Sequence, residues 1–230
     1  MSDSTTVARA SGVMAMGTLV SRVLGFVRAM VLATAIGVTA SVGADAFAVG
    51  NMLPNNVYMV LVGGVLSAVF VPQIVHSFTK KDGGVTYVNQ LITYSAILLL
   101  AVTTVALILT PLLVRLYAVG WSDDQLGLAT GFAYWCMPQI FLYGMFNILS
   151  EVLNAKKVFG PSSWAPVLNN IIVIAFLGVY IWLFGADPQG IRSVQDWSVW
   201  QIALIGGMAP LGVTLHACVL LFARRKTGIQ

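Results

Sequence analysis

Residues 86–118 read TYVNQLITYSAILLLAVTTVALILTPLLVRLYA and contain one charged side chain, Arg115. A helix needs about 20 mostly apolar residues to cross the hydrocarbon core of a bilayer, so this stretch is long enough to span a membrane. It lacks the strict alternation of apolar and polar residues that is typical of an outer-membrane β-barrel strand. The stretch therefore predicts a transmembrane helix.

Five further stretches meet the same criterion. Of the 230 residues, 58% are hydrophobic and 9% are charged, whereas an average soluble domain has about 25% charged residues. This balance excludes an ordinary soluble enzyme, a disordered chain and a nucleic-acid binder whose basic residues coat its surface. We therefore expect residues 1–230 to form a single all-α integral membrane domain, a six-transmembrane-helix bundle. Its predicted spans are 10–36, 46–75, 86–118, 127–153, 163–185 and 199–223.

The charges in the loops predict the orientation of this bundle. With six spans both termini share a side, which would carry eight basic residues: Arg9, Lys80, Lys81, Lys156, Lys157, Arg224, Arg225 and Lys226. The opposite connections carry Arg115 and Arg192 together with Asp123, Asp124, Asp187 and Asp196. Because basic residues concentrate in cytoplasmic loops, we expect both termini in the cytoplasm. The net charge of +4 is then a topology signal and needs no nucleic acid or other polyanionic partner.

Two arginines fall well inside the first predicted span. An arginine at the membrane centre costs about 2.5–3.5 kcal/mol on insertion scales unless it faces protein, water or an anion. Arg22 and Arg28 lie about 120° apart around a helix and about 9 Å apart along it, with Gly25 midway. A notch between two guanidinium groups suits a phosphate or diphosphate, and Ser21 shares the face of Arg28. Gly25 is equally suited to close helix packing.

Polar residues also gather at the start of the second predicted span. Asp45 is either a helix cap or a counter-charge to the arginines. Asn51, Asn55 and Asn56 surround Pro54, where one backbone hydrogen bond is lost. Amides at a broken helix commonly line the substrate cavity of a transporter, and the alternative is that an asparagine side chain repairs the break locally.

Motifs for catalysis or metal binding are absent from the sequence. Walker A, HExxH and GxSxG patterns do not occur, and His76 lies far from His216. The two cysteines, Cys136 and Cys218, have neither metal-ligand spacing nor the pattern of a disulfide framework. We therefore expect no catalytic residue, no metal and no cofactor, and hence a transporter rather than an enzyme.

Several short motifs occur in a fixed order along the first two spans. They are SRVLGFVR at 21–28, DAF at 45–47, LPN at 53–55 and GVLSAVFVP at 64–72. Together they resemble the MurJ/MviN family of lipid II flippases, which belongs to the multidrug/oligosaccharidyl-lipid/polysaccharide (MOP) superfamily. The resemblance extends through Ala165, Pro166 and Asn169.

This resemblance implies both an architecture and a function. Family members have two helical lobes, so this chain would be the amino-terminal lobe, and the second lobe would come from the same chain or a second copy. The implied function is alternating-access transport of an undecaprenyl-diphosphate-linked peptidoglycan precursor, lipid II, across the bacterial cytoplasmic membrane. By analogy Arg22 and Arg28 would bind the anionic head group. Ser21 and Gly25 would shape the site, Asp45 would orient or gate the arginines, and Asn55 would line the second helix.

The sequence departs from the common family pattern at three places. Ala29 stands where many members have an acid, Tyr58 and Met59 stand where many have arginine, and Gly63 replaces a common glutamate. The substrate cavity that the resemblance implies would therefore carry less positive charge than that of most family members. Two alternatives remain: another MOP-type polysaccharide or lipid exporter, or a membrane scaffold for cell-wall synthesis that transports nothing. A single lobe favours the scaffold because it has no second bundle to rock against.

Overall fold

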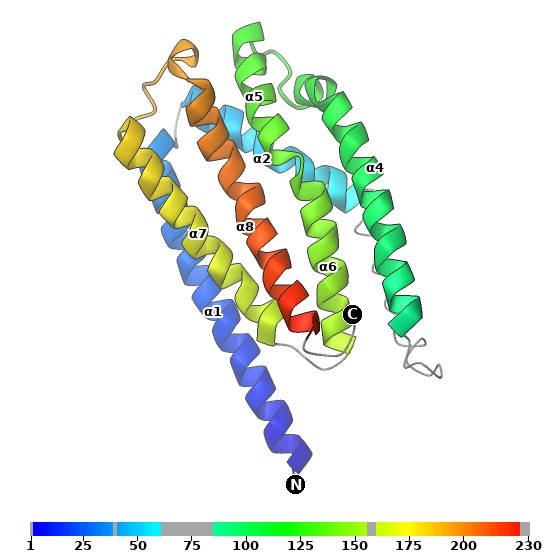
Figure 1. The fold of residues 1–230 in the computed structure, drawn as a ribbon. Coiled ribbons are helices and arrows are strands. Elements are labelled where there is room, and N and C mark those ends of the chain that lie inside the picture. The colour runs from blue at the N-terminus through cyan, green and yellow to red at the C-terminus, as the bar shows by residue number, and fades with distance from the viewer. Residues whose placement is uncertain (1, 39–40, 61–84, 156–159, 226–230) are drawn as a thin grey trace.

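The computed structural model of the protein describes residues 2–38, 41–60, 85–155 and 160–225 (Figure 1). Within these ranges the chain is almost entirely helical and contains no strand, which confirms the all-α prediction. A short 3-10 helix, η2 (Val194–Asp196), lies in the last loop. The α-helices are α1 (Ser2–Ile36), α2 (Val42–Tyr58), α4 (Val85–Tyr117), α5 (Asp123–Cys136), α6 (Gln139–Ala155), α7 (Gly160–Phe184) and α8 (Val199–Arg225).

The predicted spans correspond well to these helices. α4, α7 and α8 begin and end within a few residues of the prediction, and α1 ends at the predicted residue, Ile36. The second span begins earlier than predicted, at Val42, because Ser41 caps α2. The remainder of that span, from residue 61, lies outside the described residues, as does the predicted turn at 79–84.

The fourth predicted span, 127–153, consists of two helices. α5 ends at Cys136, where the backbone N–H of Met137 donates to Ala133 O at 2.8 Å, and α6 begins at Gln139. Pro138 lies between them, has no N–H to continue the helical ladder and sterically opposes it. Taken together, the two helices still form one apolar segment, Asp123–Leu153, that is long enough to cross a membrane.

Three further segments of the described chain are long and apolar enough to cross a membrane: Gly12–Ile36, Thr86–Tyr117 and Trp164–Phe184. α8 adds a shorter apolar stretch, Val199–Leu215. Large apolar side chains on the outer face of α4 are exposed, including Ile108 at 73%. Because lipid tails favour such a surface, the fold is that of a multi-pass membrane protein.

The helices form a row that α2 crosses. α1 packs chiefly along α7, α7 packs on α8, and α8 packs on α5 and α6, with α4 beyond them (Figure 1). α2 runs across this row and packs most extensively on α5. The start of α1 and the end of α8 lie at the same end of the bundle, and the loops at 118–122 and 185–198 lie at the opposite end (Figure 1).

The chain bends sharply between the end of α1, at Ile36, and the start of α2, at Val42; we call this bend the elbow. The loop at 185–198, between α7 and α8, packs against it. Gly37 turns the chain with a φ of 80°, and the Ser41 hydroxyl donates to Ile36 O at 2.6 Å. From the loop, the Asp187 N–H donates to Thr34 O at 3.1 Å. The buried carboxylate of Asp187 in turn accepts the backbone N–H groups of residues 191 and 192. The loop is therefore ordered against the end of α1.

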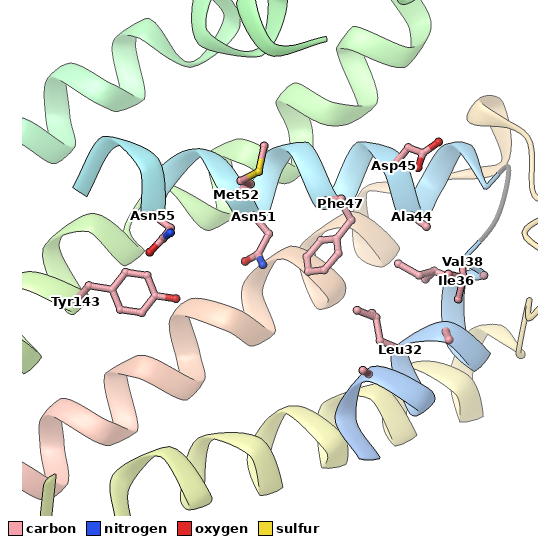
Figure 2. A pocket seen from close by; sticks show the side chains of 14 residues that line it. Leu32, Ile36, Val38, Ala44, Asp45, Phe47, Asn51, Met52, Asn55 and Tyr143 are labelled. Carbon is pink, nitrogen blue, oxygen red and sulfur yellow. The ribbon is translucent and has the colours of Figure 1, made fainter. Parts of the chain in front are cut away.

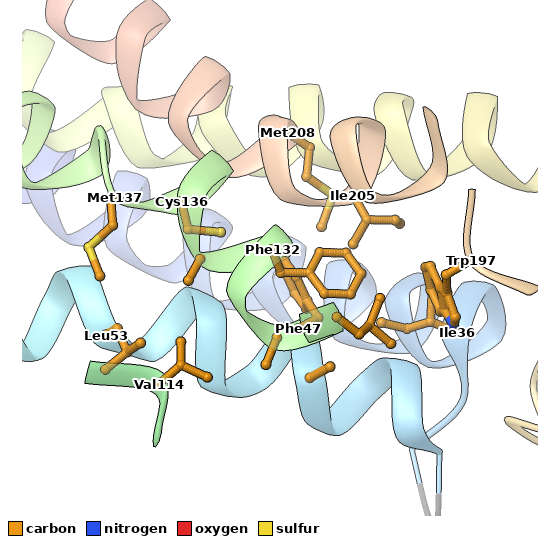
Figure 3. Close-up of a cluster of buried hydrophobic side chains, with 14 of the residues drawn as sticks. Ile36, Phe47, Leu53, Val114, Phe132, Cys136, Met137, Trp197, Ile205 and Met208 are labelled. Atoms are coloured by element: carbon orange, nitrogen blue, oxygen red, sulfur yellow. The ribbon is translucent and has the colours of Figure 1, made fainter. Parts of the chain in front are cut away.

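The core lies beside this elbow. Phe132 of α5 contacts Phe47 of α2 at 5.6 Å and Trp197 of the loop at 5.3 Å between ring centroids, both edge to face (Figure 3). α8 contributes Ile205 and Met208 to the same cluster. Gly43 lets α2 approach the indole, because a Cβ at this position would overlap the Trp197 ring. Aromatic packing thus fixes the elbow end of α2 to the bundle.

We expect Gly43→Ala to lower the stability of the protein by about 1–3 kcal/mol, because the added methyl group must displace a buried indole. Gly178→Ala in α7 is the matched control, since its Cβ would meet no atom within 4 Å. Alanine there should be neutral or slightly stabilising because it favours the helix. The measurement is thermal unfolding in detergent, and equal unfolding temperatures for both variants would contradict the packing described.

Candidate functional site

A cavity of about 660 Å³ lies in the angle between the end of α1 and α2 (Figure 2). The α1 side of the cavity is apolar, and Tyr143 of α6 lies at the end away from the elbow. Its walls are formed by Ala29, Leu32, Ala33, Ile36, Gly37, Val38, Ala44, Asp45, Phe47, Ala48, Asn51, Met52, Asn55 and Tyr143. The cavity falls within the usual size range of a small-molecule site, about 300–1,000 Å³.

Most of the cavity's polar groups come from α2. Asp45, Asn51 and Asn55 all border the cavity; Asn51 and Asn55 point toward Tyr143, whereas the Asp45 carboxylate points to the other side of α2 (Figure 2). Asp45 and Asn55 are ten residues apart, which is about 15 Å along a helix. The carboxylate therefore lies near the elbow, and the amides and the phenol lie toward the other end. The placement of Asn51 and Asn55 favours the cavity-lining alternative for the asparagines around Pro54.

The two arginines bracket the face of α1 that forms the cavity wall. At 100° per residue, Leu32, Ile36 and Ala29 all fall in the 120° sector between Arg28 and Arg22. Arg28 is half-buried, and Arg22 is exposed about 10 Å further along α1 from Ala29. The arginines therefore lie on α1 next to the cavity wall but N-terminal to the residues that line it.

The charge on Arg28 is met by a phenol rather than by an acid. Arg28 and Tyr143 lie close enough to interact electrostatically. No carboxylate forms an ion pair with Arg22 or Arg28 in the described part of the chain. In the same residues, no group of histidine, cysteine or acidic side chains could hold a metal ion. Neither Arg22 nor Arg28 is among the residues that line the cavity; both lie further along α1, without an ion pair in the described residues.

Asp45 does not act as the helix cap. The capping side chain is Ser41, whose hydroxyl accepts from Ala44 N at 3.2 Å, and Asp45 lies in the first turn of α2 with its side chain exposed. Of the two sequence alternatives the cap is therefore wrong. A direct counter-charge contact with the arginines is absent from the described residues as well, because Asp45 lies at the elbow end.

Ser21 and Gly25 lie against α7. Asn170 of α7 donates to Ser21 O at 2.9 Å and to the Ser21 hydroxyl at 3.4 Å. A Cβ at Gly25 would lie 3.8 Å from the same Asn170 amide nitrogen. Both residues therefore serve the contact between α1 and α7, and both lie inside the sector that the arginines bracket, so α7 packs against that sector at this level of α1.

Tyr143 and Gln139 of α6 were missed by the sequence analysis. Tyr143 lines the cavity, and Gln139 is buried behind it, where it hydrogen bonds to Asn51 of α2. With Asn147 they repeat at i, i+4 and i+8, which places three polar side chains on one face of an apolar helix. This spacing was the available signal, and it shows that α6 contributes to the site.

Comparison with protein families agrees with this architecture. The family model described as "Lipid II flippase MurJ" matches residues 32–230. A relative from Synechocystis sp., named "Probable lipid II flippase MurJ", is 28% identical over 99% of this chain and 42% of its own length. A relative of the same name from Rhizobium tropici is 30% identical over 85% of this chain and 36% of its own length. The chain thus spans about two fifths of these relatives.

A solved structure has the same fold. "Lipid II flippase MurJ, inward closed conformation" superposes with a TM-score of 0.66 over 91% of this chain and 41% of that chain. The sequence identity is 23%, so the likeness concerns the fold alone. Arg22 and Arg28 precede the residues that the family model matches.

We expect the cavity to be accessible to water. In a variant with Cys136 and Cys218 replaced by alanine, Asn55→Cys should react with a water-soluble maleimide, because Asn55 is exposed and lines the cavity. Leu53→Cys, two residues away on α2, should stay unlabelled because Leu53 is fully buried. Equal labelling of the two cysteines in membranes, measured by mass shift, would contradict an open cavity.

Proposed function

The chain belongs to the MurJ family, and from this premise we propose that it is the amino-terminal lobe of a lipid II flippase. Its cargo is an undecaprenyl-diphosphate-linked peptidoglycan precursor, moved across the bacterial cytoplasmic membrane for cell-wall synthesis. The protein acts as a transporter and carries out no covalent chemistry. The relatives' names support this cargo, and the chain's own arginines supply the chemistry that it needs.

The observation that carries the proposal is the position of the two arginines. Both lie inside the apolar segment Gly12–Ile36, and only 11% of the membrane window of that segment is buried in the described protein. Arg22 is exposed and Arg28 is half-buried, and a guanidinium group on such a helix cannot be left in contact with lipid tails at low cost. A diphosphate resolves this problem, because arginine binds phosphate oxygens through paired hydrogen bonds.

Each candidate residue has a role in this proposal. Arg22 and Arg28 bind the diphosphate, and Ser21 and Gly25 shape the site by setting α1 against α7. Asn55 offers a hydrogen-bonding amide to the sugars of the head group. Asp45 lies at the elbow end of the cavity and does not contact the arginines in this conformation. It would act as a gating residue, pairing with an arginine only after the helices move.

The uncovered face of α1 also implies a second half. Alternating access requires two bundles that move against each other around a shared site. We propose that a second lobe, from the same chain or from a second copy, faces the arginine-bearing side of α1 and closes the cavity. The polyprenyl tail of the precursor remains in the bilayer throughout.

The proposed orientation places both termini in the cytoplasm. The start of α1 and the end of α8 lie at one end of the bundle (Figure 1), and the sequence near them is basic, with Arg9, Arg224 and Arg225. The opposite end carries Asp123, Asp187 and other acidic residues. This asymmetry supports the cytoplasmic assignment through the positive-inside rule.

The proposal predicts that the arginines are needed for export of the precursor. In cells depleted of their own lipid II flippase, Arg22→Ala and Arg28→Ala should each fail to restore growth, although the wild-type protein restores it when expressed with its second lobe. Loss of one charged hydrogen-bonding partner typically costs about 2–5 kcal/mol, which is enough to abolish useful transport.

Arg115→Ala is the matched control, because Arg115 is an exposed arginine in the last turn of α4, away from the cavity. It should restore growth as the wild type does. All variants are compared at equal membrane levels by immunoblot. Full rescue by Arg22→Ala and Arg28→Ala would remove the basis of the proposal.

A further inference from the structure

A buried hydrogen-bonded chain joins α2 to α6 behind the cavity. Gln139 is 1% exposed, and its Nε2 donates to Asn51 Oδ1 at 3.2 Å. The Tyr143 hydroxyl donates to Gln139 Oε1 at 2.7 Å. Gln139 is therefore the middle member of a chain whose two outer members both line the cavity.

The amide of Gln139 is held between two partners. Its oxygen accepts from Tyr143 and its nitrogen donates to Asn51, while the buried thiol of Cys136, one turn earlier, donates to Gly206 O at 3.6 Å. In this arrangement both polar ends of the buried amide are satisfied, and an unsatisfied end would cost about 1–3 kcal/mol. The Gln139 side chain is thus held in one orientation.

This orientation determines what the cavity offers to a ligand. Because Asn51 Oδ1 accepts a hydrogen bond from Gln139, the Asn51 amide nitrogen remains as an N–H donor at the cavity wall (Figure 2). Because the Tyr143 hydroxyl donates its hydrogen bond to Gln139, the phenol oxygen can only accept further hydrogen bonds. The charged group near that oxygen is Arg28, which only donates.

We propose that Gln139 is a positioning residue for anion recognition: it orients Asn51 as a donor into the cavity and keeps the Tyr143 oxygen as an acceptor. The Asn51 amide, together with Arg28 further along α1, then binds a phosphate or diphosphate group. This inference rests on the proposed function, since it assigns to α6 a part in binding the same head group.

Joining the two helices does not by itself require Gln139. Two turns further along α6, Asn147 donates to the Tyr58 hydroxyl of α2 at 2.8 Å. That pair also links α2 with α6, but neither residue lines the cavity. Asn147 is therefore a matched control: its loss removes the same kind of bond between the same helices and leaves the hydrogen bonds of Gln139 to Tyr143 and Asn51 in place, although the centroid of the Tyr58 ring lies 6.2 Å from that of the Tyr143 ring.

The test compares a charged and an uncharged ligand of the same chain length. The affinities of farnesyl diphosphate and of farnesol are measured by titration calorimetry for the purified protein in nanodiscs. The ratio of the two affinities reports recognition of the diphosphate, whereas a loosened fold would weaken both ligands together. The variants are Gln139→Met, Tyr143→Phe, both together, Asn147→Leu and Arg28→Ala.

We expect Gln139→Met and Tyr143→Phe each to lower this ratio about tenfold, the scale of one hydrogen bond to a charged group. The double variant should lose no more than the larger single effect, because both changes break one chain. Asn147→Leu should leave the ratio unchanged, even if it lowers the unfolding temperature as much as Gln139→Met does.

Two results would overturn this inference alone. If Arg28→Ala lowers the ratio but Gln139→Met does not, the arginine binds the anion without help from α6. If the double variant lowers the affinity ratio by the product of the two single effects, Gln139 does not act through Tyr143. A third result, in which the wild type and Arg28→Ala show the same ratio, would instead remove the proposed function and this inference with it.

Discussion

The free energy of keeping a guanidinium group inside a membrane is the constraint on which the rest of this structure depends. Arg22 and Arg28 lie in a segment that is otherwise apolar, and α1 packs chiefly along one neighbour, α7. A charge at this depth must meet protein, water or an anion. The open face of α1, the cavity beside it and the phenol near Arg28 all follow from that requirement.

The two ends of the cavity differ in how firmly they are built. At the elbow, Gly37, Ser41 and the loop at 185–198 hold α1 and α2 through hydrogen bonds and the packing of Trp197. At the other end, the lining consists of amides and a phenol that depend on Gln139. A cavity that is rigid at the elbow and polar at its far end is suited to admit a charged head group from the side of the arginines.

Much of this fold could be predicted from the sequence because the membrane imposes strong, local rules. Apolar length predicted the helices, and the cost of burying charge singled out Arg22 and Arg28 as candidates; the cytoplasmic side that the loop charges indicate stays a prediction. The division at Pro138 could not be predicted, since transmembrane helices often tolerate proline when neighbours satisfy the freed backbone groups. The cap at Ser41 rather than Asp45 depends on the local path of the elbow. The role of Gln139 depends on α2 crossing α6, which no local pattern encodes.

The proposed function depends most directly on one contact, between the two arginines of α1 and the diphosphate of a lipid carrier within the membrane. Solid-state NMR can measure this contact directly, as dipolar dephasing between ¹⁵N-labelled arginine side chains and the ³¹P nuclei of undecaprenyl diphosphate in bilayers. We predict clear dephasing for the wild-type protein and its loss in the Arg22→Ala/Arg28→Ala double variant. Dephasing that persists unchanged in the double variant would assign the diphosphate to other arginines and contradict this account.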